Sequence, residues 1–150
     1  MSKLKEQLYL LCTDYIKKKE TEIKKIIAEA SEAANNDTKS SAGDKFETGR
    51  EIMQQEIDLN ITRLNEINKL KLVMERILPD QKSVTVQPGS IVCTNNGNYY
   101  IAISSGQLKA DGALYFGISA ASPIGEKMIG QKSGYQFTLN GKTYKIESVA

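Results

Sequence analysis

Two carboxylates, Asp44 and Glu47, stand three residues apart in the stretch 35–47, which reads NNDTKSSAGDKFE. On one turn of a helix, residues at this spacing share a face, so both can contact one Mg²⁺ ion or orient a water molecule bound to it. The same pair also suits a helix start, with Asp44 as cap and Glu47 at the third helical position, where acids favour the helix dipole. Spacing alone leaves both interpretations open, and capping is the more common one.

Long helical patterns run up to this stretch and away from it. Apolar residues recur at steps of three and four from Leu4 to Ala34, and again from Phe46 to Leu78, where Pro79 ends the pattern. Arg50, Asn60 and Lys71 fill intervening positions of the second stripe. We therefore predict an antiparallel coiled-coil hairpin over residues 1–78, about 45 Å long, with its tip at 35–47.

The periodicity changes after a linker at residues 79–88. Two β-rich runs flank the turn signal Asn95-Asn96-Gly97, and further runs predict strands at 113–119, 135–139 and 142–149, with a loop at 105–111 and an additional short strand at 84–86. Ser122 and Pro123 fit the cap and first position of a short helix that Gly130 closes. The predicted fold class is α+β, with a small antiparallel β domain at 89–150.

Composition narrows the functional classes. The net charge is only +2, which argues against a chain that grips nucleic acid through charge alone, and the absence of His excludes imidazole ligands and Ser-His-Asp sites. Cys12 and Cys93 fall in different predicted domains, so we expect free thiols in a reducing cytoplasm. No apolar run is long enough to span a bilayer, and we expect no membrane partner.

The C-terminal part carries a family resemblance. The run Ile118-Ser119, Ser122-Pro123-Ile124-Gly125, Met128-Ile129-Gly130, Lys132 and Gly134 resembles the C-terminal domain of the Gre-type transcript cleavage factors of bacterial RNA polymerase, an FKBP-like fold. Gly43-Asp44-Lys45-Phe46-Glu47 is similar to the G-D-x-x-E at the coiled-coil tip of that family. The coiled coil and the β domain also follow in the same order, so the resemblance covers nearly the whole chain.

The resemblance implies a transcription elongation factor. Residues 81–150 would bind RNA polymerase through Ser122, Pro123 and Ile124, and residues 1–78 would enter the secondary channel to stimulate cleavage of the RNA 3′ end in a backtracked complex. Asp44 would help to hold a second Mg²⁺ shared with the polymerase active centre, and Glu47 would assist through metal or water. The chain would then be a cytoplasmic monomer and not itself an enzyme.

Departures from the family pattern keep other functions open. Cleavage-competent tips usually read G-D-L-S-E-N-A-E-Y, whereas here Lys45-Phe46 follows the aspartate, and Lys45 and Arg50 add positive charge that weakens Mg²⁺ binding. One alternative is therefore an inhibitory or regulatory binder of the channel without cleavage activity. Others are an FKBP-like prolyl isomerase or chaperone, which the absence of Trp disfavours, and a homodimeric coiled-coil adaptor.

Overall fold

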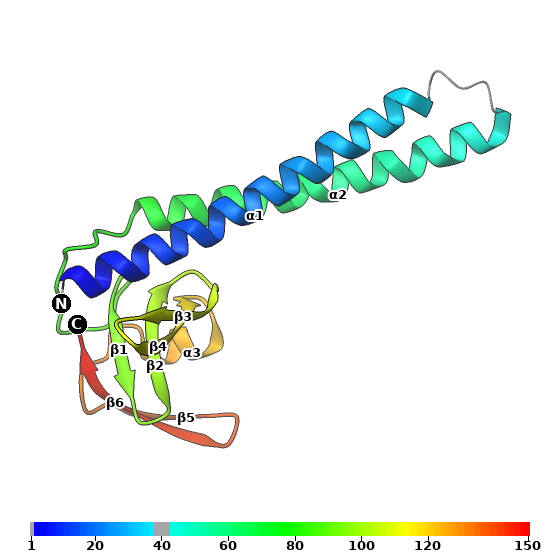
Figure 1. The fold of residues 1–150 in the computed structure, drawn as a ribbon. Coiled ribbons are helices and arrows are strands. Elements are labelled where there is room, and N and C mark those ends of the chain that lie inside the picture. The colour runs from blue at the N-terminus through cyan, green and yellow to red at the C-terminus, as the bar shows by residue number, and fades with distance from the viewer. Residues whose placement is uncertain (1, 38–42) are drawn as a thin grey trace. The chain divides into compact units, whose positions relative to one another are not determined.

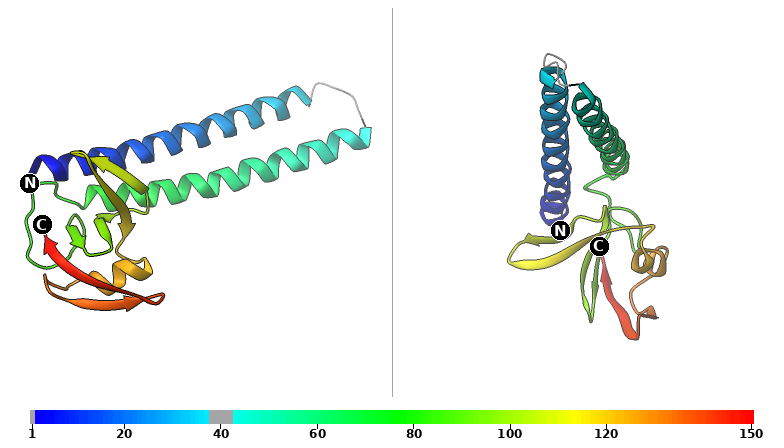
Figure 2. Two further views of the ribbon diagram at one scale, coloured as in Figure 1. Left: turned by 60° about the horizontal axis from the view of Figure 1, so that its bottom comes forward. Right: turned by 90° about the vertical axis from the view of Figure 1, so that its right-hand side faces the viewer.

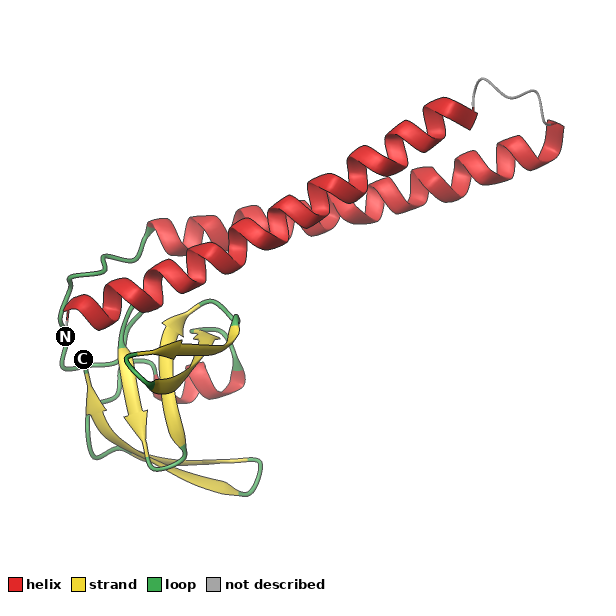
Figure 3. Cartoon of the chain, in the orientation of Figure 1, coloured by secondary structure: helices red, strands yellow, loops and turns green. Residues whose placement is uncertain are grey.

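The computed structural model describes the backbone of residues 2–37 and 43–150, and side chains for residues 3–33 and 49–150. Two long helices, α1 (Ser2–Asp37) and α2 (Gly43–Glu75), precede a six-stranded sheet and a short helix, α3 (Pro123–Met128) (Figures 1 and 3). This arrangement confirms the predicted α+β class and the helical hairpin.

The chain forms two compact units. The base unit comprises residues 1–15 and 72–150, and the arm unit comprises residues 16–71. The first turns of α1 and the last turn of α2 therefore belong to the same unit as the sheet. The finer division predicted from the sequence, into a coiled coil at 1–78, a linker at 79–88 and a domain at 89–150, stays a prediction.

The arm unit has a narrow buried stripe. In α1, Ile16, Ile23 and Ala30 recur at seven-residue steps, and in α2 the same step joins Asn60 to Ile67. A repeat of seven keeps one seam of each helix against its partner, as in an antiparallel coiled coil. The helices have 36 and 33 residues, which correspond to about 50 Å of helix each.

The second helix ends earlier than the sequence predicts. Its last residue is Glu75, four residues before Pro79, and the backbone N–H groups of Arg76 and Ile77 then donate to carbonyls three residues back. Such tightened bonds are common in a last helical turn. Leu78, which the pattern placed in the buried stripe, is 63% exposed.

The six-stranded sheet has the order β3-β4-β2-β1-β6-β5 (Figures 1 and 2). The strands are β1 (Ile91–Thr94), β2 (Gly97–Ala102), β3 (Gly106–Ala110), β4 (Ala113–Ser119), β5 (Gln136–Leu139) and β6 (Lys142–Val149). The sheet is mixed and not wholly antiparallel, because β2 and β4 run parallel, with Tyr99 opposite Phe116.

Two strand predictions are wrong in detail. Residues 105–111 were predicted as a loop, but they contain β3, which pairs with β4 across a tight turn at Asp111-Gly112. Both turn residues have positive φ, 49° and 72°, which is the conformation that Asp-Gly favours in a two-residue hairpin. The strand predicted at 84–86 is reduced to an isolated bridge between Thr85 and Lys132.

Strand β2 is buried on both faces, which makes it the centre of the base unit. Tyr99 and Ile101 belong to a core shared with α3, β5 and β6, whose buried members are Val86, Val92, Tyr99, Ile101, Met128, Phe137 and Ile146. The intervening Tyr100 is fully buried beside Cys12 and Tyr9 of α1. The first turns of α1 therefore complete the hydrophobic core of the base unit on the second face of β2.

Candidate functional site

The predicted docking helix α3 begins as its sequence indicates. Ser122 is the N-cap, and its Oγ atom accepts a hydrogen bond from Gly125 N at 3.1 Å and donates one to Ser119 O at 2.6 Å. Pro123 occupies the first turn, where a missing N–H leaves no partner unsatisfied. The helix start is thus fixed by side-chain hydrogen bonds and by the proline ring.

The three predicted docking residues have different surroundings. Pro123 is exposed, whereas Ser122 is half-buried in its capping role and Ile124 packs against the core of the base unit. Gly125 leaves no room for a side chain, because an added Cβ atom would lie 2.1 Å from Ser119 O. Among these three, Pro123 is therefore the residue whose side chain is open to a partner.

The predicted acidic residues lie at the start of α2. This helix begins at Gly43, so Asp44 is its second residue and Glu47 its fifth, and not its cap and its third residue as the sequence predicts. Their side chains lie outside the described residues, as do those of Lys45 and Phe46. Their roles as Mg²⁺ ligands and as tip residues stay predictions, and the side chains that are described form no group of three or more Cys, Asp or Glu that would hold a metal ion.

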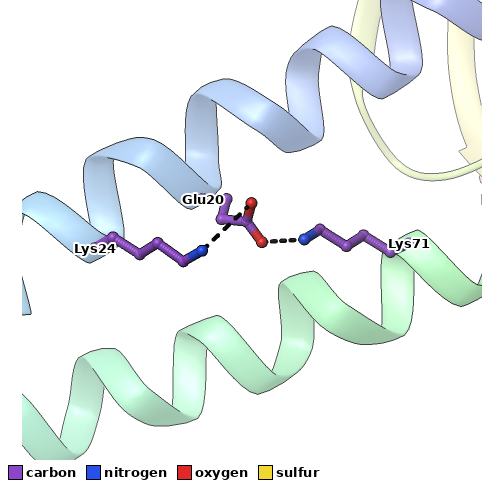
Figure 4. Close-up of polar contacts among 3 residues, drawn as sticks. All are labelled: Glu20, Lys24 and Lys71. Atoms are coloured by element: carbon purple, nitrogen blue, oxygen red, sulfur yellow. Dashed lines mark hydrogen bonds and ion pairs between the residues drawn. The ribbon is translucent and has the colours of Figure 1, made fainter.

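An ion pair joins the two helices of the arm unit. Glu20 of α1 accepts a hydrogen bond from Lys71 of α2 and lies 3.8 Å from Lys24 on its own helix (Figure 4). The hydrogen bond from Lys71, assisted by the charges of both lysines, lowers the pKa of Glu20. The sequence indicated Lys71 as a polar interruption of the stripe, but the partner across the hairpin was missed, because it depends on the pairing register.

A second polar residue is buried in the same stripe. Asn60 is only 2% exposed, and its Nδ2 atom donates to the carbonyl of Glu56 at 2.8 Å. Arg63 approaches the Oδ1 atom of Asn60 at 3.4 Å. A buried asparagine at a seam position fixes the register of a coiled coil at some cost in stability.

The tip and the docking residues belong to different units. Asp44 and Glu47 are in the arm unit, and Ser122, Pro123 and Ile124 are in the base unit. Within the described ranges, no helix is long and apolar enough to cross a membrane. The candidate residues are therefore described as two separate elements, the start of α2 with its two acids and the capped helix α3 with the exposed Pro123.

Comparisons with known proteins gave one structural likeness. No protein-family model and no curated protein sequence matches the chain. A solved structure described as that of the transcription factor Gfh1 matches 94% of this chain and 92% of its own chain, at 15% sequence identity and a TM-score of 0.33. At this identity and TM-score, the likeness carries no argument about function.

Proposed function

We propose that this chain is a Gre-type transcription elongation factor that stimulates cleavage of backtracked RNA by RNA polymerase. The base unit would bind the polymerase, and the helical hairpin would enter the secondary channel. The observation that carries the proposal is that Asp44 and Glu47 lie at the start of α2, a helix of 33 residues that follows the 36-residue α1.

The hairpin suits the delivery of acids through a narrow channel. A helix pair is slender, and helices of this length span about 50 Å. The seam of Ile16, Ile23, Asn60 and Ile67, together with the ion pair between Glu20 and Lys71, supports a defined register between the helices. A defined register would in turn fix which residues stand at the tip.

The chemistry assigned to the tip is assistance to a metal ion that the polymerase holds. Hydrolysis of a phosphodiester by two metals requires oxygen ligands for the second Mg²⁺ and a positioned water molecule. Asp44 would supply a carboxylate to this ion, and Glu47, three residues further along the helix, would bind the same ion or its water. The active centre would belong to the polymerase, so the chain itself would not be an enzyme.

A second function is favoured by the residues beside these acids. Lys45 and Arg50 bring two positive charges to the first turns of α2, and they oppose Mg²⁺ binding at Asp44 and Glu47. With this charge pattern the hairpin would occupy the channel and slow RNA synthesis without cleavage. The second candidate is therefore an inhibitory or regulatory channel binder.

One assay separates the two functions. A stalled, backtracked complex of the cognate RNA polymerase carrying 3′-labelled RNA is incubated in Mg²⁺ with the wild-type chain, Asp44→Ala or Glu47→Ala. Asp58→Ala is the matched control, because Asp58 is an exposed acid of α2 far from the turn. Binding of each variant to the polymerase is measured in parallel.

The proposed function predicts short labelled 3′ fragments with the wild type and the control, and their loss with both tip variants although binding is kept. The second candidate predicts binding and slower synthesis without fragments, and Lys45→Leu would then be the first variant to test for recovered cleavage. A chain that does not bind polymerase overturns both functions.

A further inference from the structure

A recess of about 330 Å³ lies within the base unit. Its walls come from three stretches of the chain: Lys5 of α1, Asp80, Lys82 and Val84 after α2, and Val149 at the end of β6. This volume is at the lower end of the range for pockets that hold small organic molecules. The proposed transcription function makes no use of it.

Lys5 is unusual among the lysines whose side chains the structure describes. It is only 4% exposed, and its ammonium donates a hydrogen bond to the carbonyl of Gln81. An ammonium carries three N–H donors, so a single carbonyl leaves donor capacity unused. Lysine is almost never fully buried unless its charge is paired.

Lys5 takes part in no ion pair within the described part of the protein, and Asp80 is the one acidic side chain among the residues that line its recess. The ion pairs there join Glu20 to Lys24 and Lys71, and Glu66 to Lys69, and none of them includes Lys5 or Lys82. Burial and the nearby charge of Lys82 both lower the pKa of Lys5. Two ammonium groups thus repel each other at one recess, and a bound anion would relieve this repulsion.

The remaining walls select the shape of such an anion. Val84 is 75% exposed and, with Val149, gives the recess an apolar side that suits a hydrocarbon body. Asp80 lines the same recess and would repel a second acidic group. We propose that this recess binds a small organic anion, with one carboxylate or phosphate group facing Lys5 and Lys82 and an apolar body against Val84 and Val149.

The test is a titration of small-molecule probes into the full chain, monitored by ¹H–¹⁵N correlation spectra. Four probes separate the two parts of the ligand: phenylacetate and phenyl phosphate carry an acid on a ring, inorganic phosphate lacks the ring, and benzyl alcohol lacks the charge. The variants are Lys5→Met, which keeps the buried stem, and Lys82→Gln, which changes an exposed side chain. Lys127→Gln is the control, because this exposed lysine lies outside the recess.

The expected result is a saturable change in the amide chemical shifts of residues 80–84 and 149–150 when phenylacetate or phenyl phosphate is added, whichever acid fits better. Both recess variants should weaken this binding roughly tenfold, as expected for the loss of a charge-assisted hydrogen bond, and the control should not. The proposal is overturned if neither ring acid gives a saturable shift, if benzyl alcohol binds as well, or if Lys82→Gln binds like the wild type.

Discussion

The Sγ atom of Cys12 lies 3.9 Å from the Oγ atom of Ser105, so α1 contacts the residue that directly precedes β3. The thiol is fully buried, and Tyr100 of β2 lies beside it. Burial raises the pKa of Cys12 to about 11, although the contact with Ser105 acts in the opposite direction. The base of α1 is therefore part of a core that also includes the sheet.

The first prediction concerns thiol reactivity. The thiolate is the reactive form, and Cys12 is both buried and protonated at neutral pH, whereas Cys93 is half-buried. A chromogenic disulfide reagent at pH 8 should modify Cys93 within minutes and Cys12 only after denaturation. Cys93→Ala should abolish the fast phase. A fast phase that persists in this variant would mean that the base of α1 does not stay packed on the sheet.

The second prediction concerns alkaline pH. The folded chain holds the Cys12 proton up to about pH 11, whereas the unfolded chain releases it near the ordinary value of 9.0. The unfolded state therefore binds fewer protons in this window, so the free energy of unfolding should fall from pH 9 to pH 11, by about 2–3 kcal/mol from this group.

Denaturant titrations of the wild type and Cys12→Ala at several pH values test this prediction. The raised pKa of Tyr100 acts in the same direction, and the lowered pKa of Lys5 acts in the opposite direction. Both of these groups remain in the variant, so the difference in slope reports Cys12 together with its electrostatic effect on Tyr100. Parallel curves for the two proteins between pH 9 and pH 11 would contradict the raised pKa.

A third prediction follows from the close approach at Gly125. An alanine Cβ atom would lie 2.1 Å from Ser119 O, a backbone atom that cannot move without breaking the start of α3. Gly125→Ala should lower the free energy of unfolding by about 3 kcal/mol or more, despite the better helix propensity of alanine. Gly49→Ala is the comparison, because its Cβ atom would meet nothing within 4 Å.

Gly49 lies inside α2 without positive φ, so alanine there should stabilise the helix by about 0.5–1 kcal/mol. Thermal unfolding followed by circular dichroism measures both changes. Equal effects of the two substitutions on stability would show that the backbone around Ser119 moves to make room for the added Cβ atom.

The fourth prediction separates capping from docking at Ser122. Its hydroxyl makes two hydrogen bonds at the start of α3, so Ser122→Ala should cost about 1–2 kcal/mol of stability. Ser122→Thr keeps donor and acceptor and should restore most of this loss. If both variants unfold like the wild type, the Ser122 cap does not stabilise α3, and a role of Ser122 in docking would then explain the residue better.

Local signals in the sequence predict much of this fold correctly. Ser122-Pro123 marks the start of α3, and the Asn140-Gly141 turn joins the final hairpin, because each depends on residues close in the chain. The β3 strand was missed, although Asp111-Gly112 is itself a hairpin signal, since the polar residues around it suggested a loop. The parallel pairing of β2 with β4 has no local signal, because it depends on where β3 is placed in the sheet.

Long-range contacts explain what periodicity did not predict. Cys12 of α1 is fully buried and its thiol contacts Ser105, a residue 93 positions away that helical spacing does not reveal. Likewise, a buried Lys5 beside Lys82 depends on the fold of the whole base unit. Asp44 and Glu47 were found from type and spacing, and their function stays a prediction.

The last prediction concerns the buried asparagine of the arm. Asn60 occupies a seam position at the same seven-residue step as Ile67, and its side chain is satisfied by Glu56 and Arg63 of its own helix. Replacement by leucine removes the cost of burying an amide, so Asn60→Leu should raise the free energy of unfolding by about 1–2 kcal/mol. It should also relax the pairing register, since a polar seam residue disfavours shifted and multimeric arrangements.

Thermal unfolding and the molar mass in solution measure these two effects together. Asn65→Leu is the matched control, because Asn65 is exposed on the same helix and leucine there gains no burial. We expect a more stable Asn60→Leu chain whose molar mass rises at high concentration, and a control whose stability and molar mass match those of the wild type. A destabilised, strictly monomeric Asn60→Leu chain would show that the asparagine contributes net stability to the hairpin, and that its hydrogen bonds outweigh the cost of burial.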